Sequence, residues 1–374
     1  MSSGASMVAT ATTPAWIVGS SGLLAGELAR LLEGHPSLEL RSAVSREGGR
    51  SLRELHPHLE RDLTTVELDA ALEQLRAELE HAPEGDDPAL ALFLGLPHGQ
   101  SAAVWQRLAS ELGHLAERIA VVDLSADYRL ADPELHAAHY GAPAPDPSGR
   151  EAFVYGLPEL RRGRIRRSRR VAAPGCFATV LQLAVLPAAV DGWLDLGSPW
   201  ILNAVTGSSG SGIAPKATTH HPFRHGSFKA YSPTGHRHEA ELQQSLADFW
   251  IEAPLHFLPH SGPWSRGIHL TASLPLAEGR DFDGALERLR ACYAERYDEE
   301  PFVRLLPAGE VPELRTVVGS NRVDLALFLR GRVLTVLAVI DNTIKGGSGQ
   351  ALQCMNLMLG LPEAAGLART GLAY

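Results

Sequence analysis

Cysteine chemistry is the first expectation raised by this 374-residue sequence, because one of its three cysteines lies where a helix should begin. Cys176 follows Pro174 and Gly175 and leads into an apolar helical pattern. The dipole and free N–H groups of a helix start stabilise a thiolate, and also an oxyanion on a carbonyl that the sulfur attacks. Cys292 and Cys354 lie inside helical runs, where inert cysteines are common. Cys176 is therefore the candidate nucleophile.

A thiol nucleophile needs a group that moves its proton. His236 and His238 flank Arg237 immediately before a further helical run. Side chains two positions apart do not share one side of a helix, so we expect only one of these imidazoles to face the site. An imidazole with a pKa near neutrality suits proton transfer.

Another group of histidines lies in a loop and is the natural place to look for metal ligands: His220, His221 and His225. No carboxylate or thiolate completes a recognisable ligand spacing with this group or with the pair before the helix. We expect no metal ion.

A cofactor turn is predicted near the N-terminus. Gly19-Ser20-Ser21-Gly22 separates a short apolar strand, 15–18, from a helix that begins at Leu23. Glycines at such a turn let the backbone approach a pyrophosphate, whose charge then lies at the helix N-terminus. The next strand ends at Ser45-Arg46, and a hydroxyl and a guanidinium there suit the 2′-phosphate of NADP. The alternative for Arg46 is a solvated loop residue.

These groups need a scaffold, and the pattern of the chain predicts one. Strands alternate with helices over roughly the first 160 residues, which indicates a right-handed, doubly wound parallel sheet of the Rossmann type. The expected strands are 15–18, 38–44, 90–94 and 119–123, and the expected helices begin at Leu23, Leu68 and Ser101. From Ala172 the pattern is less regular, with a hairpin over 323–329 and 334–340 and a closing helix from about Gly349.

The composition excludes several classes of protein. Hydrophobic residues make up 45% and charged residues 21%, which is ordinary globular usage. The net charge of −9 argues against a nucleic-acid partner. No apolar run reaches the roughly 18 to 20 residues that cross a bilayer. Three scattered cysteines and the lack of a signal-peptide pattern favour a reduced, cytoplasmic protein.

Taken together, the motifs of the chain resemble those of N-acetyl-γ-glutamyl-phosphate reductases, within the wider group that includes aspartate-semialdehyde dehydrogenases. The resemblance spans 19–367 and rests on the ordered segments 19–22, 96–99, 123–130, 155–159, 174–176, 235–238, 266–268 and 341–350. It implies an α/β architecture, in which a Rossmann-type NADP-binding domain over 14–172 is completed by 341–374. Residues 173–340 would form an α+β catalytic and oligomerisation domain, and 1–13 a disordered extension.

The resemblance also implies a reaction: Cys176 attacks an acyl phosphate, phosphate leaves, and NADPH reduces the thioester to a semialdehyde. His236 matches the acid/base histidine of the family, with His238 in reserve. The implied cations and polar groups around the substrate are Arg129, Lys216, Arg237, Arg266 and His238. The implied cofactor contacts are Gly19, Ser20, Ser21, Gly22, Ser45, Arg46, Pro97, His98, Gly99, Ser125, Asn342, Gly347 and Gly349. By analogy we expect a homodimer or homotetramer.

Some positions depart from the family pattern. Ala173, Phe177 and Ala178 stand where the family usually has Asn, Tyr and Pro, and Ala25 replaces a third glycine of the cofactor turn. The altered residues around the cysteine leave open a catalytically inactive, NADP-binding regulatory protein.

A second alternative concerns the substrate. Segments 219–224 and 233–238 resemble related aminoadipyl-phosphate reductases, which act on carrier-bound substrates in lysine or ornithine synthesis. The arginine cluster over 161–170 could dock an acidic carrier protein, or be a solvated basic loop. Pro174 and the segment 265–268 favour the free N-acetylglutamyl substrate of arginine biosynthesis.

Overall fold

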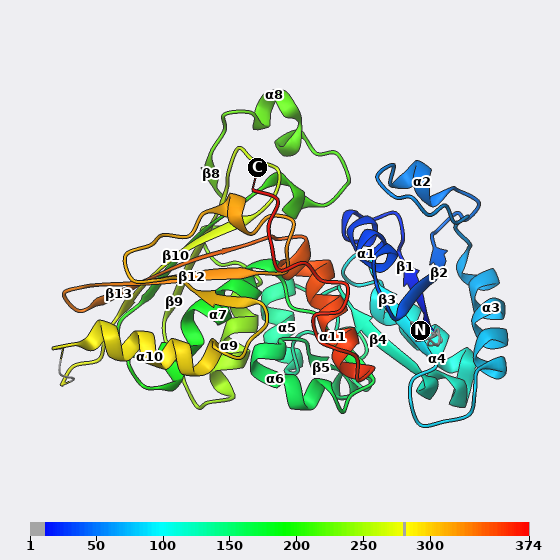
Figure 1. The fold of residues 1–374 in the computed structure, drawn as a ribbon, viewed down its shortest axis with the longest axis horizontal. Helices are drawn as coiled ribbons and strands as arrows, with labels where there is room; N and C mark the ends of the chain where they lie inside the picture. The colour runs from blue at the N-terminus through cyan, green and yellow to red at the C-terminus, as the bar shows by residue number, and fades with distance from the viewer. Residues whose placement is uncertain (1–11, 280–281, 374) are drawn as a thin grey trace, which may run out of the picture.

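Two β-sheets, joined by the C-terminal helix, make up the protein in this computed structural model, which describes residues 12–279 and 282–373 (Figure 1). Most of the predicted N-terminal extension, 1–11, lies outside the described residues. The first strand begins at Thr13, one residue before the domain boundary expected at 14.

The first sheet is six-stranded and entirely parallel, in the order β2-β1-β3-β4-β6-β5. Its strands are β1 (Thr13–Val18), β2 (Leu38–Val44), β3 (Leu90–Leu94), β4 (Ile119–Asp123), β5 (Val154–Tyr155) and β6 (Arg170–Ala172). Four of these strands were predicted: β2, β3 and β4 have the expected bounds, and β1 begins two residues earlier than expected, because each is a short apolar run bounded by turn residues. The short strands β5 and β6 were not predicted.

Helices cover both faces of this sheet, as a doubly wound fold requires. Helix α1 (Leu23–Glu33) lies on one face, and α3 (Leu68–His81) and α4 (Ser101–Leu112) lie on the other. Shorter helices fill the connections: α2 (Leu52–Leu55), α5 (Pro133–Tyr140) and α6 (Pro158–Ile165), with 3₁₀ turns η1 (Gly113–Arg118) and η2 (Arg150–Ala152).

The second sheet is seven-stranded and mixed, in the order β11-β12-β13-β10-β7-β9-β8. Its strands are β7 (Trp200–Thr206), β8 (Lys229–Ala230), β9 (Leu255–Ser261), β10 (Ile268–Pro275), β11 (Val303–Leu305), β12 (Val323–Arg330) and β13 (Val333–Ile340). The predicted hairpin is confirmed, because β12 and β13 pair antiparallel across Gly331 and Arg332.

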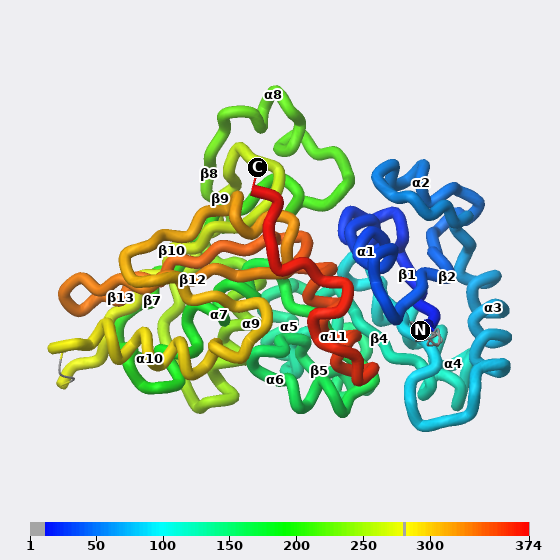
Figure 2. Tube along the Cα trace, in the orientation of Figure 1, coloured from blue at the N-terminus to red at the C-terminus, as the bar shows by residue number. Residues whose placement is uncertain are grey.

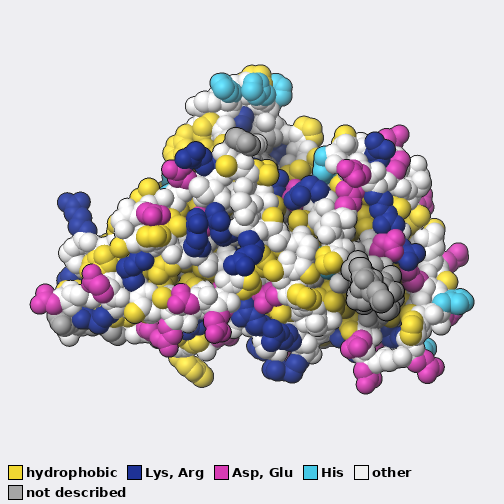
Figure 3. Space-filling view, in the orientation of Figure 1, with side chains coloured by type: hydrophobic (Ala, Val, Ile, Leu, Met, Phe, Trp, Pro, Cys, Tyr) yellow, Lys and Arg dark blue, Asp and Glu magenta, His cyan; other side chains and the backbone are white. Residues whose placement is uncertain are grey.

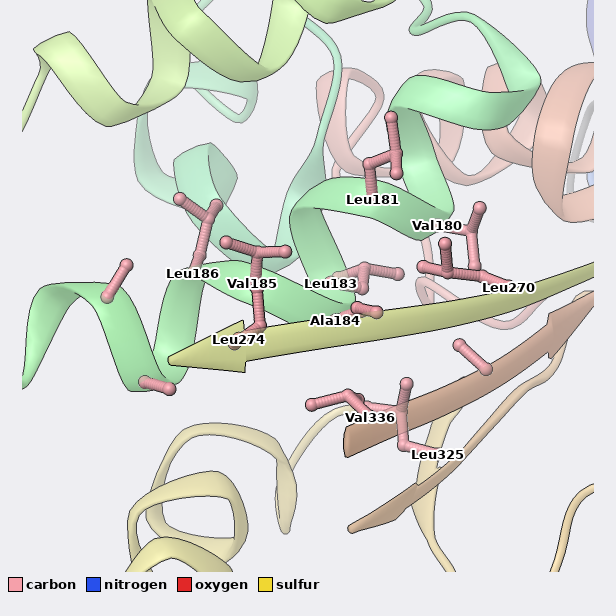
Figure 4. Packing of buried hydrophobic residues seen from close by; sticks show 14 of the residues in the cluster. Val180, Leu181, Leu183, Ala184, Val185, Leu186, Leu270, Leu274, Leu325 and Val336 are labelled. Carbon is pink, nitrogen blue, oxygen red and sulfur yellow. The ribbon is translucent and has the colours of Figure 1, made fainter. Parts of the chain in front are cut away.

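One face of this second sheet is the core of the domain. Helices α7 (Cys176–Val190), α9 (Glu239–Ala247) and α10 (Ala285–Tyr297) cover it. Figure 4 shows Val180 and Leu183 of α7 lying over Leu270 of β10. Side chains on the opposite face, such as Val205, Thr271 and Leu337, are only half-buried. This alternation leaves one face of the sheet without helices among the described elements.

The chain returns between the two sheets at its C-terminal end (Figure 2). A π-helical turn, η6 (Ile344–Ser348), leads into α11 (Gly349–Met358). Leu352 and Met355 of α11 share a hydrophobic cluster with Ile17 of β1 and Leu28 of α1. The segment after β13 is thus part of the core of the first sheet.

A loop carrying α8 (His221–Arg224) and the 3₁₀ turns η3 (Ser208–Ser211) and η4 (Ala217–Thr219) projects from the second sheet (Figure 1). A further 3₁₀ turn, η5 (Leu314–Thr316), precedes β12. Within the described ranges, no helix combines the length and the apolar character needed to span a membrane.

Candidate active site

The strand ends of the first sheet bring the cofactor turn and the candidate nucleophile to one edge. Hydrogen bonds step from strand to strand along this edge: Gly95 N–H donates to Val18 O (2.7 Å), Leu124 N–H to Leu94 O (2.9 Å) and Ala173 N–H to Asp123 O (2.8 Å). All strands point the same way, so the loops after β1, β3, β4 and β6 meet there. In open α/β sheets this carboxyl edge is where ligands bind.

Cys176 is the first residue of α7, as predicted, and Gly175 is the residue before the helix. Gly346 of η6 lies directly against the cysteine, because a Cβ on Gly346 would come within 2.7 Å of the Cys176 Cβ. The sulfur is thus held where the two sheets and the C-terminal segment meet. The family asparagine at 173 is replaced by Ala173, whose carbonyl accepts a hydrogen bond from Arg129 Nε (2.8 Å).

Both candidate histidines lie beside Phe177, the residue after the candidate nucleophile. The rings of His236 and His238 have their centres 5.6 and 6.0 Å from that of Phe177, and 4.7 Å from each other. Helix α9 begins only at Glu239, so the two residues lie in the turn before it and helical spacing does not separate them. His236 Nδ1 accepts the N–H of His238 (3.2 Å), so in the neutral ring Nε2 carries the proton and can donate it to a ligand.

A buried carboxylate that the sequence analysis did not single out lies under this turn. Glu241, on α9, is 0% exposed. It accepts hydrogen bonds from Gly175 N–H (2.9 Å) and the Tyr155 hydroxyl (2.8 Å) and pairs with Arg129 (3.4 Å). A single glutamate in a helical run carries no sequence signal for such a role, because only the fold brings α9 against the end of β6.

Burial sets the proton state of the site. It raises the pKa of the Cys176 thiol to about 11, even though Arg129, the Phe177 N–H and Arg237 favour the thiolate. This direction runs against the thiolate expected from the helix start and favours the protonated thiol near neutral pH. Burial and the charge of Arg237 lower the pKa of His236 to about 4, so that imidazole is neutral and not poised near pH 7.

Arg237 is the exposed cation at this site, and its guanidinium lies 5.9 Å from the ring centre of Tyr140. The Tyr140 hydroxyl is buried and lies within reach of the Arg129 guanidinium. Burial, with the nearby charge of Glu241, raises its pKa to about 12, so it keeps its proton to donate. No sequence motif pointed to Tyr140, which is the last residue of α5.

Two predicted substrate cations are placed differently. Arg266 is engaged at the junction between the sheets, with Asp341 (2.6 Å) and with Glu27 of α1 (3.1 Å). Lys216 is exposed in the projecting loop, where its ammonium donates to the Ser211 carbonyl (3.3 Å). Within the described part of the chain, neither is recorded in contact with Cys176 or the histidines beside it. Arg129 is 6% exposed and tied to Leu124 O (2.9 Å) and Glu241, so it neutralises charge inside the site.

The cofactor turn has the geometry that a pyrophosphate needs. Gly19 has φ +89°, and a Cβ there would lie 2.7 Å from Gly95 O. Gly22 precedes α1 without a side-chain cap, so the first N–H groups of the helix are left for an anion. Ser21 is exposed, whereas Ser20 is buried and its hydroxyl has no hydrogen-bond partner within the described ranges. These features fit a dinucleotide phosphate.

The other predicted cofactor residues divide into surface and buried groups. Ser45 is half-buried, and Arg46, Pro97, His98 and Gly99 are exposed at the ends of β2 and β3. Ser125, by contrast, is bound to the Asp123 carboxylate (2.7 Å), and Asn342 accepts the N–H of Gly267 (2.6 Å).

The two C-terminal glycines are packing positions. A Cβ on Gly347 would meet Leu24 of α1 at 2.9 Å, and one on Gly349 would meet Ile344 at 2.4 Å. Glycine at these two positions lets η6 and α11 pack closely against their neighbours. This packing accounts for both glycines without a contact to the cofactor.

Histidine side chains gather on the projecting loop around α8 (Figure 3). The rings of His221 and His225 lie 5.5 Å apart. Even so, no set of three or more His, Cys, Asp or Glu side chains in the described segments could hold a metal ion.

Comparisons with known proteins agree with this arrangement. Residues 15–168 match the family model for the semialdehyde dehydrogenase NAD binding domain, and residues 176–342 match that for the semialdehyde dehydrogenase dimerisation domain. Among solved structures, aspartate semialdehyde dehydrogenase II of Vibrio cholerae is 14% identical, with a TM-score of 0.64 over 94% of this chain and 99% of that one. The Candida albicans enzyme, solved with NADP, is 14% identical, with a TM-score of 0.61 over 93% and 98%. Fold and site thus define a protein of the semialdehyde dehydrogenase class.

The sequence relatives are closer. N-acetyl-γ-glutamyl-phosphate reductase of Methanopyrus kandleri is 38% identical over 95% of this chain and 98% of the relative. The Nitrosococcus oceani enzyme of the same name is 40% identical over 94% and 96%. The chain belongs to the N-acetyl-γ-glutamyl-phosphate reductase family.

Proposed function

We propose that this protein reduces N-acetyl-γ-glutamyl phosphate to N-acetylglutamate semialdehyde with NADPH, as a step of arginine biosynthesis in the cytoplasm. The observation that carries the proposal is the common edge of the parallel sheet, which holds both the Gly19–Gly22 turn and Cys176. A thiol, an imidazole and a dinucleotide turn at one edge suit acyl transfer followed by reduction. Residues 14–172 with 341–374 would act as the cofactor unit, supported by the packing of α11 on α1 and β1.

In the first step the Cys176 sulfur bonds to the acyl carbon and the carbon–oxygen bond to phosphate breaks. The thiol proton goes to the departing phosphate, toward which the Nε2–H of His236 donates a hydrogen bond. NADPH held at the Gly19–Gly22 turn would supply the hydride that reduces the resulting thioester. The N–H groups at the start of α7 stabilise the oxyanion on that carbon. When the carbon–sulfur bond breaks, the Nε2–H of His236 gives its proton to the sulfur, the semialdehyde leaves, and a proton from solvent restores the imidazole.

Arg237 is our choice for the cation that holds the substrate anion, with the Tyr140 hydroxyl as its neighbouring donor. It is exposed beside the buried site, while Arg129 and Arg266 already have carboxylate partners. Arg237→Ala should raise KM at least tenfold, since a charge-assisted contact contributes roughly 1.5–3 kcal/mol. Lys216→Ala, as the matched control, should change KM less than twofold.

The assay that tests the reaction runs it in reverse. N-acetylglutamate semialdehyde, phosphate and NADP should generate NADPH absorbance with the wild-type protein. Cys176→Ala should lower this rate at least 1,000-fold, because covalent catalysis is lost, while Cys292→Ala serves as the control. Equal rates for wild type and Cys176→Ala would remove the assigned nucleophile, and no NADPH formation with the wild type would favour the inactive regulatory alternative.

Ion pairs within the chain occupy part of the arginine cluster over 161–170, and this favours a free substrate over a carrier-bound one. Arg161 and Arg162 pair with Asp248 and Glu300 within the chain, and Arg170 pairs with Glu117. Arg164, Arg166 and Arg167 remain exposed for a partner. Turnover only with a carrier-linked aminoadipyl or glutamyl phosphate would replace our choice of substrate.

We further propose a homodimer or homotetramer that uses the uncovered face of the second sheet. The half-buried Val205 and Leu337 on that face support this assembly. Light scattering coupled to gel filtration measures it, and a monomer would contradict it.

A further inference from the structure

We propose that Glu241 is a positioning residue for the reaction: its buried carboxylate holds the Gly175 N–H and Arg129 in place around Cys176. This inference rests on Cys176 being the nucleophile of the proposed function. Glu241 is not among the predicted site residues. It acts on the Cys176 sulfur indirectly, through Gly175 and Arg129.

The two oxygens of the carboxylate have different tasks. Oε2 accepts the Gly175 N–H (2.9 Å) and the Tyr155 hydroxyl (2.8 Å), while Oε1 faces Arg129 Nη1 (3.4 Å). Gly175 is the residue before α7, so its N–H fixes the direction in which the chain enters the helix at Cys176. Arg129 in turn bonds the Ala173 carbonyl (2.8 Å), two residues before Gly175. One carboxylate thereby holds the turn from both ends.

The network continues away from the site and fixes Glu241 itself. Gln182 of α7 donates to the Tyr155 hydroxyl (2.7 Å) and also to the Ala178 carbonyl (2.9 Å). Glu241 has no exposed surface, so water cannot replace these partners. A buried anion stays in place only when it is paired and hydrogen-bonded in this way, and removing one partner is costly.

The geometry also places a negative charge near the sulfur. Arg129, Arg237 and Glu241 all act on Cys176, the first two favouring the thiolate and the last opposing it, and Tyr231 also lies within electrostatic reach. The rings of His236 and His238 pack against Phe177, the residue after Cys176. Glu241 thus has two opposite effects, since it orders the nucleophile but disfavours its ionisation.

Glu241→Gln separates these effects. The amide oxygen can still accept from Gly175 and Tyr155, but its NH₂ group then faces Arg129 and releases it. Loss of the negative charge should lower the pH midpoint of Cys176 alkylation by iodoacetamide by about one unit. Alkylation at pH 7.5 should then be about threefold to tenfold faster. Turnover should move the other way, with kcat at least tenfold lower and KM within threefold, because the sulfur is no longer well aimed.

This split between faster alkylation and slower turnover is the signature of the proposal. A purely structural role would slow both or leave the alkylation midpoint in place, and either result overturns it. A purely electrostatic role would speed both, which also overturns it. The alkylation readout needs no substrate, so it remains informative if the proposed reaction fails.

Tyr155→Phe is the companion variant, needed if Glu241→Gln does not fold. It removes one hydrogen bond to the carboxylate but keeps the charge. We expect the alkylation midpoint to stay or rise and kcat to fall about threefold to tenfold. Wild-type kcat in Tyr155→Phe would contradict the positioning role.

Discussion

The turns before α1 and before α7 have almost the same local form but opposite surroundings. Gly22 and Gly175 precede their helices with φ/ψ of −76°/156° and −68°/149°, and neither helix has a side-chain cap. The first turn is open, with Ser21 exposed, so its N–H groups are left for a ligand. The second is buried, and its Gly175 N–H is already bound by Glu241. We infer that the same strand–turn–helix form is suited to bind an anion before α1 and to present a nucleophile before α7, because different segments pack around the two turns.

The strongest test of the open turn is Gly19→Ala against Gly22→Ala. Gly19 combines a left-handed φ with a Cβ position 2.7 Å from Gly95 O, whereas a Cβ on Gly22 has ordinary contacts at 3.7 Å. Gly19→Ala should weaken NADPH binding at least 100-fold and destabilise the fold by about 1–3 kcal/mol. Gly22→Ala should change binding only a few-fold. Fluorescence titration and thermal unfolding measure both, and similar effects for the two variants would contradict the comparison.

The buried turn is tested by Gly346→Ala. The added methyl group would lie 2.7 Å from the Cys176 Cβ and must displace the nucleophile. We expect kcat to fall about 100-fold, since small misplacements of a reacting group are costly, with NADPH affinity unchanged. Gly163→Ala, where the nearest atom is the flexible end of Arg167 at 3.7 Å, is the control for a glycine substitution. A wild-type kcat for Gly346→Ala would show that the sulfur has room to move.

The pH dependence of the free energy of unfolding tests the burial of His236 beside the second turn. The pKa of His236 is lowered to about 4 in the folded protein by burial and Arg237, so the unfolded chain binds protons first as the pH falls. The stabilising contribution of the neutral ring is therefore complete above pH 6.5 and is lost between about pH 6.5 and 4. Urea unfolding should show wild type losing about 2–3 kcal/mol more than His236→Gln over this range. Parallel curves for the two proteins would mean that this ring is not held in its neutral form.

The smallest expected effect concerns the rim of the open turn. Arg46→Ala should raise KM for NADPH about tenfold and leave KM for NADH unchanged, because only the 2′-phosphate would lose its partner. Arg53→Ala, an exposed arginine of α2, is the control. An equal change in KM for NADPH and NADH would show that Arg46 is a solvated loop residue with no contact to the 2′-phosphate.

Much of the scaffold was predictable because its signals are local. The strands β2, β3 and β4 are short apolar runs with polar or glycine turns, and their bounds agree with the sequence-based ones. Cys176 at the start of α7 was predictable for the same reason. Helical spacing does not apply to His236 and His238, because both lie in a turn before α9, so the prediction that only one of them faces the site stays a prediction.

What the sequence by itself determined is therefore the parallel sheet, the glycine turn and the cysteine at a helix start, each set by hydrophobic period and by neighbours a few positions away. Only the tertiary structure decided the partners. It engaged Arg266 with Glu27 and Asp341, and it kept Lys216 in an exposed loop. It also placed Glu241 under Gly175, 66 positions away along the chain. The physical reason is that burial and pairing of charge depend on which distant segments meet, and local sequence patterns carry no record of that.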